Sequence, residues 1–135
     1  MKRIAINKSV TSLLISIFYG LAIAVQLLVI LKVIPYKWVN GGMSGSYETQ
    51  AIQSAVSIVI IVALYIFVRK IEKMGVAINK RTLWALYVIT LFWTLGLFMQ
   101  IFGTAFERLF LSPLLLLGVI SHALLIIRVH STRTH

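Results

Sequence analysis

The chain of 135 residues is 60% apolar and 12% charged, and its mean hydropathy of +0.99 excludes an ordinary soluble globular domain. It contains no cysteine, which excludes disulfide exchange, thiolate nucleophiles and thiolate metal sites. The net charge of +10 does not indicate nucleic-acid binding, because no aromatic residues are interleaved with the main basic cluster.

Four apolar segments are long enough to cross a bilayer as helices. A hydrocarbon core about 30 Å thick takes about 20 mostly apolar residues, because every backbone polar group must be hydrogen-bonded within the segment. The predicted helices cover residues 10–34, 51–68, 83–102 and 107–127. The sequence therefore predicts an all-α protein, a four-helix transmembrane bundle formed by one integral membrane domain, residues 1–135.

The first of these segments also has features of a secretory signal peptide. It begins with basic residues and contains the small-residue triplet Ala22-Ile23-Ala24, as at a signal peptidase site. The apolar run continues to Leu31, however, and is too long for the apolar region of a signal peptide. We therefore expect the first helix to be retained.

The connections between the helices contain helix-end signals. Pro35 is expected to end the first helix, and Asn40-Gly41 predicts a turn within the longest connection, residues 35–50. Ser46 and Asn79 are predicted to be the N-caps of the second and third helices, because their side chains can accept a free backbone N–H.

The start of the fourth helix allows two interpretations. Thr104 to Glu107 matches a capping box directly after Gly103, which predicts an antiparallel hairpin of the third and fourth helices. Pro113 lies further along, where it removes a backbone hydrogen bond and would kink the helix. Alternatively, Ser112 and Pro113 begin the membrane helix proper, and residues 106–111 lie along the outer interface.

The basic residues predict the orientation of the chain. Three of the 13 lie on one side of the predicted membrane, at Lys32, Lys37 and Arg108. The other ten lie on the opposite side, at Lys2, Arg3, Lys8, Arg69, Lys70, Lys73, Lys80, Arg81, Arg128 and Arg133. The positive-inside rule then predicts a multi-pass protein of the plasma membrane with both termini cytoplasmic.

Polar residues gather at the predicted outer end of the bundle, and Gln26 lies in the outer half of the first helix. Polar groups inside a bilayer are costly, so their position is informative. We hypothesise an outward-opening ligand-binding pocket with the candidate residues Trp38, Asn40, Gly41, Gly42, Glu48, Gln53, Gln100, Glu107 and Arg108. Alternatively, the glutamines bridge neighbouring helices, Trp38 belongs to an interfacial aromatic belt, and Glu107 with Arg108 forms a solvated helix start.

His122 is the one ionisable residue predicted to lie well inside the membrane. A buried histidine suggests a proton relay, but no acidic residue is expected at its depth, so we expect a neutral ring that donates to a neighbouring helix. The sequence contains no aspartate and no HExxH, GxSxG or phosphate-cradling motif. We therefore predict no enzyme activity, no catalytic residues, no cofactor and no metal site.

Four stretches of the sequence resemble a known group of proteins. They are WVNGG at 38–42, SYETQ at 46–50, TLG at 94–96 and FERLFLSPLLLL at 106–117. Together they are similar to segments of small uncharacterised bacterial four-helix integral membrane proteins, common in Gram-positive bacteria. The resemblance implies a compact plasma-membrane bundle and implies no particular activity. Met43 departs from the group, in which a basic residue often follows the glycine pair.

The function predicted from these features is that of a non-enzymatic accessory or regulatory membrane protein. Its predicted partners are the lipid bilayer, and either a lipid or a membrane protein bound at the outer face, or a second copy of the chain. A small transporter or channel subunit is the alternative, and it would need an oligomer, because so few buried polar groups cannot line a path alone. A membrane-embedded enzyme acting on lipids is a third interpretation.

Overall fold

The computed structural model describes residues 6–133, and these contain four long α-helices and no strand. The helices are α1 (Lys8–Ile30), α2 (Tyr47–Met74), α3 (Lys80–Ile101) and α4 (Ser112–Arg133). All four helical segments are long and apolar enough to cross a membrane, the last one counted together with the turn that precedes α4. The predicted all-α fold with four apolar helices is therefore confirmed.

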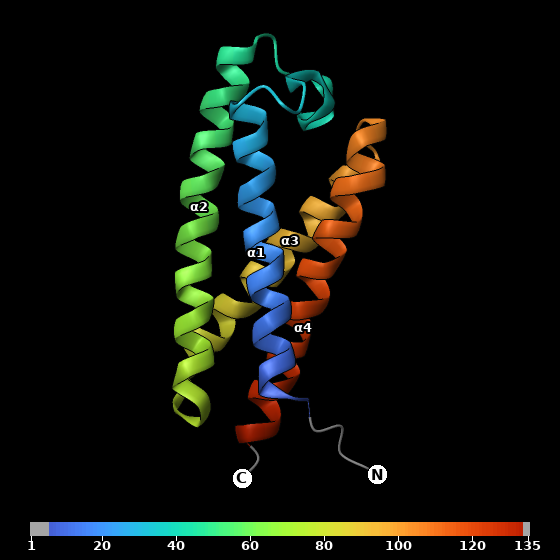
Figure 1. The fold of residues 1–135 in the computed structure, drawn as a ribbon. Helices are drawn as coiled ribbons and strands as arrows, with labels where there is room; N and C mark the ends of the chain where they lie inside the picture. Colours follow the sequence, from blue (N-terminus) through green and yellow to red (C-terminus); the bar gives the residue numbers. More distant parts are fainter. Residues whose placement is uncertain (1–5, 134–135) are drawn as a thin grey trace.

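The helices run up and down, so the connections lie alternately at two ends of the bundle (Figure 1). We call the end with residues 31–46 and 102–106 the loop end, and the end where α1 begins and α4 finishes the terminal end. α1 packs against both α2 and α4, and α3 packs against α4, as predicted for a hairpin. α2 and α3 make few contacts with each other, although they are consecutive in sequence. The bundle is therefore open along one side, between α2 and α3.

The core at the contact of α1 and α4 depends on Gly118. A Cβ atom at this position would lie 2.5 Å from the ring of Phe18, so only glycine lets the ring pack against the α4 backbone. Phe18 is fully buried and meets the Trp93 indole edge to face, with ring centroids 4.9 Å apart. These contacts tie three helices together.

His122 is fully buried beside this cluster. Its Nδ1–H donates to the Gly118 carbonyl over 2.6 Å, because a carbonyl can only accept. Nε2 of the neutral ring then accepts from the Tyr19 hydroxyl at 2.9 Å, and the Tyr19 oxygen accepts from Trp93 Nε1 at 3.4 Å. The expectation that His122 donates to a neighbouring helix was wrong, since it donates within its own helix and accepts from α1.

Several helix boundaries differ from the prediction, including the end of the fourth helix, which lies at residue 133 and not at 127. α1 ends at Ile30 and not at residue 34, because Lys32 adopts a left-handed conformation (φ 61°) in a Schellman motif. α2 covers residues 47–74 and not 51–68, because Ser46 caps it by accepting from the Thr49 N–H at 3.2 Å. At its other end, Arg69, Lys70 and Lys73, which lie beyond the predicted end at residue 68, continue the helix.

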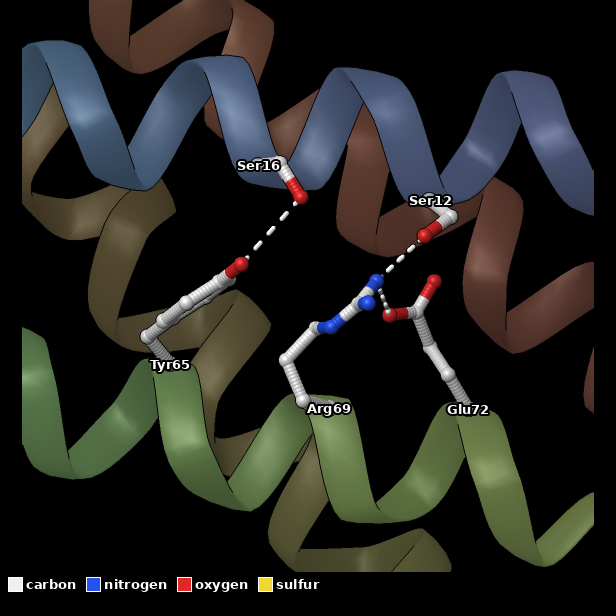
Figure 2. A network of polar contacts seen from close by, with 5 residues as sticks. All are labelled: Ser12, Ser16, Tyr65, Arg69 and Glu72. Atoms are coloured by element: carbon white, nitrogen blue, oxygen red, sulfur yellow. Dashed lines mark hydrogen bonds and ion pairs between the residues drawn. The ribbon is translucent and has the colours of Figure 1, made fainter.

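Figure 2 shows the polar contacts that this part of α2 makes with α1. Arg69 forms an ion pair with Glu72, with 2.9 Å between Nη1 and Oε2, and it also donates to the Ser12 hydroxyl of α1. One turn away, the Tyr65 and Ser16 hydroxyls lie 3.3 Å apart. Glu72 is only 6% exposed, so this network holds a carboxylate between the helices near the terminal end.

The third helix also differs slightly from the prediction. Asn79 caps α3 by accepting from the Thr82 N–H at 2.8 Å, and the helix covers residues 80–101, where 83–102 was predicted.

The start of the fourth helix combines the capping box with a wider turn. Residues Glu107–Leu111 form the π-helical turn η4, which leads directly into α4. Pro113 therefore lies inside a continuous helical segment and does not begin it. The π turn fits this position, because the proline ring would clash with a carbonyl in a regular α-helical turn.

Candidate ligand-binding site

The longest connection folds over the loop end and is held there by Glu107, which is 2% exposed. The Gly41 N–H donates to both carboxylate oxygens of Glu107, at 3.1 and 3.0 Å, and the Thr104 N–H donates to Oε2 at 2.6 Å. The Glu107 N–H in turn donates to the Thr104 hydroxyl at 3.3 Å, which confirms the capping box. A capping carboxylate therefore also binds a distant loop.

Glycines make this arrangement possible at two positions. Gly41 has a φ of 63°, between Asn40 and Gly42, which also have positive φ angles of 51° and 70°. Side chains with a Cβ are strained in this region, and the left-handed turn points the Gly41 N–H at the carboxylate. At Gly103, a Cβ would lie 2.2 Å from Glu107 Oε2, so any other residue would displace the buried carboxylate.

The same connection is bound to α2 by side-chain amides. Asn40 Nδ2 donates to Oε1 of Gln50 at 3.0 Å and of Gln53 at 2.8 Å. The Ser44 hydroxyl donates to the same Gln50 oxygen at 2.5 Å. Gln50 is 2% exposed and donates onward to the Ser54 hydroxyl at 3.2 Å. Residues 40–44 therefore form a bridge from α2 to the Glu107 carboxylate.

Two adjoining cavities lie beneath this bridge, on the open side of the bundle. The one deeper among the helices has a volume of about 460 Å³, and the one next to the connection has about 790 Å³. They share four lining residues, Asn40, Ser57, Met99 and Gln100, which come from the connection, α2 and α3. Drug-sized ligands occupy pockets of about 300–1,000 Å³, so this space is large enough for a ligand or part of one.

The mouth of the cavities is apolar. Their walls include the side chains of Ile60 on α2 and of Phe92, Leu95 and Met99 on α3, which are 45%, 51%, 56% and 69% exposed. Exposed side chains of this kind are stable in contact with acyl chains and unfavourable in water. The space between α2 and α3 therefore opens sideways, toward the expected hydrocarbon core.

The inner surface is polar but carries few charges. Gln26, Asn40, Ser57 and Gln100 contribute amide and hydroxyl groups to the deeper cavity. Among the described residues that line either cavity, only Glu107 has an ionisable side chain. Oε1 of Gln100 is buried without a hydrogen-bond partner in the described structure. A buried acceptor of this kind costs free energy unless another molecule satisfies it.

The structure brings together five of the nine predicted site residues. Gln53, Gln100 and Glu107 line the cavities with Asn40 and Gly41. Two other candidates, Trp38 and Gly42, support the bridge. The Trp38 carbonyl accepts from the Thr104 hydroxyl at 2.5 Å. A Cβ atom on Gly42 would lie 3.1 Å from the Lys37 carbonyl oxygen, so glycine allows this close approach.

The remaining two candidates do not belong to this site. Glu48 and Arg108 are exposed and line neither cavity. Sequence reasoning also missed Ser44, Gln50 and Ser57. The spacing of Gln50, Gln53 and Ser57 by three and four residues would have identified one polar face of α2.

Metal binding has no structural counterpart in the part of the chain that the structure describes, where no group of three or more His, Cys, Asp or Glu side chains gathers. No protein-family model matches the chain, and no curated protein or solved structure shows significant similarity to it.

Proposed function

We propose that this chain is a multi-pass plasma-membrane protein that binds a lipid in the space between α2 and α3, without catalysing its conversion. One observation carries the proposal. The two adjoining cavities have an apolar mouth between two helices and a polar inner end beneath residues 40–44. A lipid likewise has an apolar part and a polar part. Its acyl chains favour the apolar mouth, and its headgroup favours the amide groups at the inner end.

The proposed orientation has the loop end outside the cell and both termini in the cytoplasm. It rests on the excess of Lys and Arg at the terminal end. Because the chain has no cysteine, single introduced cysteines can report the orientation directly. In intact cells, a membrane-impermeant maleimide should label Gly45→Cys and leave Ala77→Cys unlabelled. Labelling of Ala77→Cys in sealed cells would reverse the proposed orientation.

Photocrosslinking tests the binding site. The protein is reconstituted in vesicles of phosphatidylcholine that contain a lipid with a diazirine in its acyl chain, and the labelled peptides are identified by mass spectrometry. We expect labelling to concentrate on the α2 and α3 residues of the mouth, such as Ile60 and Leu95. Equal labelling of exposed apolar residues elsewhere, such as Leu13 and Ile127, would contradict a specific site.

A matched pair of variants completes this test. Ser57→Phe places a ring in both cavities, because Ser57 lines each of them. Ala55→Phe adds the same ring two residues away, at an exposed position that lines neither. Labelling of the mouth should fall in the Ser57 variant and persist in the Ala55 variant. Unchanged labelling in both variants would show that the cavities are not the site.

A further inference from the structure

The chemical class of the bound lipid follows from the polar atoms of the deeper cavity. Gln100 Oε1 is buried and unpartnered, and it can only accept a hydrogen bond. Gln26, which lines the same cavity from α1, forms no side-chain hydrogen bond with the described residues. A headgroup donor would satisfy the Gln100 oxygen, and Gln26 can donate to or accept from the same group.

The charges of the site disfavour an anionic headgroup. No Lys or Arg side chain of the described residues lines either cavity, whereas the Glu107 carboxylate lies at the polar end. Within the described part of the chain, no cation lies within ion-pairing distance of Glu107. A phosphate would lose its hydration without gaining a cationic partner, and the adjoining cavity carries a like charge at Glu107.

The charges do not call for a cationic headgroup either. Both oxygens of Glu107 already accept backbone N–H groups, from Gly41 and Thr104, at 2.6–3.1 Å. Backbone donors stabilise a carboxylate without an ion pair. An ammonium group would therefore have to compete with an existing hydrogen-bond network.

We infer that the cavity selects an uncharged lipid with a free hydroxyl group, of the diacylglycerol type, and that Gln100 accepts the hydrogen bond from this hydroxyl. The inference rests on the proposed lipid-binding function. It adds the headgroup chemistry and the residue that recognises it. A hydroxyl group suits both amides, because it donates to Gln100 and accepts from the Gln26 amide.

Three probes with the same acyl chains test this inference. They are dioleoylglycerol, its 3-acetyl ester, in which the donor is blocked, and dioleoyl phosphatidic acid, in which a phosphate replaces the hydroxyl. Binding is titrated by native mass spectrometry of the full chain in detergent. We expect dioleoylglycerol to bind about five- to 150-fold more tightly than the acetyl ester, the range of one satisfied buried acceptor. Phosphatidic acid should bind more weakly than dioleoylglycerol.

Variants assign the preference to Gln100. Gln100→Met keeps an unbranched side chain of similar length but removes the amide. This substitution should weaken the binding of dioleoylglycerol to the level of the acetyl ester. It should leave the binding of the acetyl ester unchanged, whereas a general loss of structure would weaken both. Met99→Leu changes the neighbouring lining residue but leaves the Gln100 amide in place. This variant should keep the preference for dioleoylglycerol over the acetyl ester.

The outcomes separate this inference from the proposed function. Labelling of the mouth by the photoactivatable lipid, combined with equal binding of the three probes, would retain the lipid site and overturn the hydroxyl preference. Tighter binding of phosphatidic acid, or of a long-chain amine, would also overturn it. Absence of labelling at the mouth would overturn the lipid site itself.

Discussion

The carboxylate of Glu107 accepts the backbone N–H of Gly41, although the two residues are 66 positions apart in the chain. This contact joins the first connection to the start of the fourth helical segment. It closes the loop end of a bundle in which α2 and α3 scarcely touch. The bridge of residues 40–44 therefore covers the cavities while their side remains open.

Replacing Glu107 by glutamine should destabilise the protein by about 1.5–3 kcal/mol, the range of hydrogen bonds to a charged group. The amide has one acceptor oxygen where the carboxylate has two, so it cannot serve the Gly41 and Thr104 N–H groups equally well. Thermal unfolding in detergent measures the effect. Glu48→Gln, at an exposed position, is the control and should change stability by less than about 0.5 kcal/mol. Equal losses in both variants would contradict the buried role of Glu107.

Tyr19→Phe should cost about 1–3 kcal/mol, because it leaves polar atoms of His122 and Trp93 buried without a partner. Tyr65→Phe removes a hydroxyl that makes one longer contact, 3.3 Å from Ser16, at a half-buried position. Its cost should be smaller. Denaturation of the two variants side by side in the same detergent compares them, and a larger effect at Tyr65 would refute the importance of the His122 network.

Gly118→Ala should separate α1 from α4, because the added methyl group would lie 2.5 Å from the Phe18 ring. Overpacking of this kind costs about 1–3 kcal/mol. The control Gly96→Ala meets only Leu115, at 3.5 Å, and should be tolerated. If the Phe18 contact is the cause, the double variant Gly118→Ala with Phe18→Leu should be more stable than Gly118→Ala alone. Failure of this rescue would place the cause elsewhere.

Arg69→Gln should destabilise the protein more than Lys70→Gln, although both remove one positive charge. Arg69 pairs with Glu72, which is 6% exposed, and reaches Ser12 on α1 (Figure 2). Loss of one partner leaves a buried carboxylate without its counter-charge, which costs about 3 kcal/mol when the pair is deeply buried and less here, because Arg69 is 37% exposed. Lys70 is exposed and serves as the matched control. Equal unfolding temperatures for the two variants would disprove the difference.

The positions of several helix ends could be predicted from the sequence because their signals are local. The apolar lengths require helices, and Ser46, Asn79 and Thr104 each bond a backbone N–H three residues ahead. An interaction within one helical turn involves no other part of the fold. The same reasoning placed Glu107 in a capping box and missed its bond to Gly41, because nothing local specifies a partner 66 residues away.

What only the tertiary structure decided is which faces of the helices meet. Gly118 could not be identified as the contact with Phe18, because hydropathy this uniform does not reveal the rotation of a helix about its own axis. By itself, then, the sequence determined four apolar helices and their caps, through length and hydrogen bonds within a turn. The open side between α2 and α3, and the polar atoms within it, were decided by packing between distant residues.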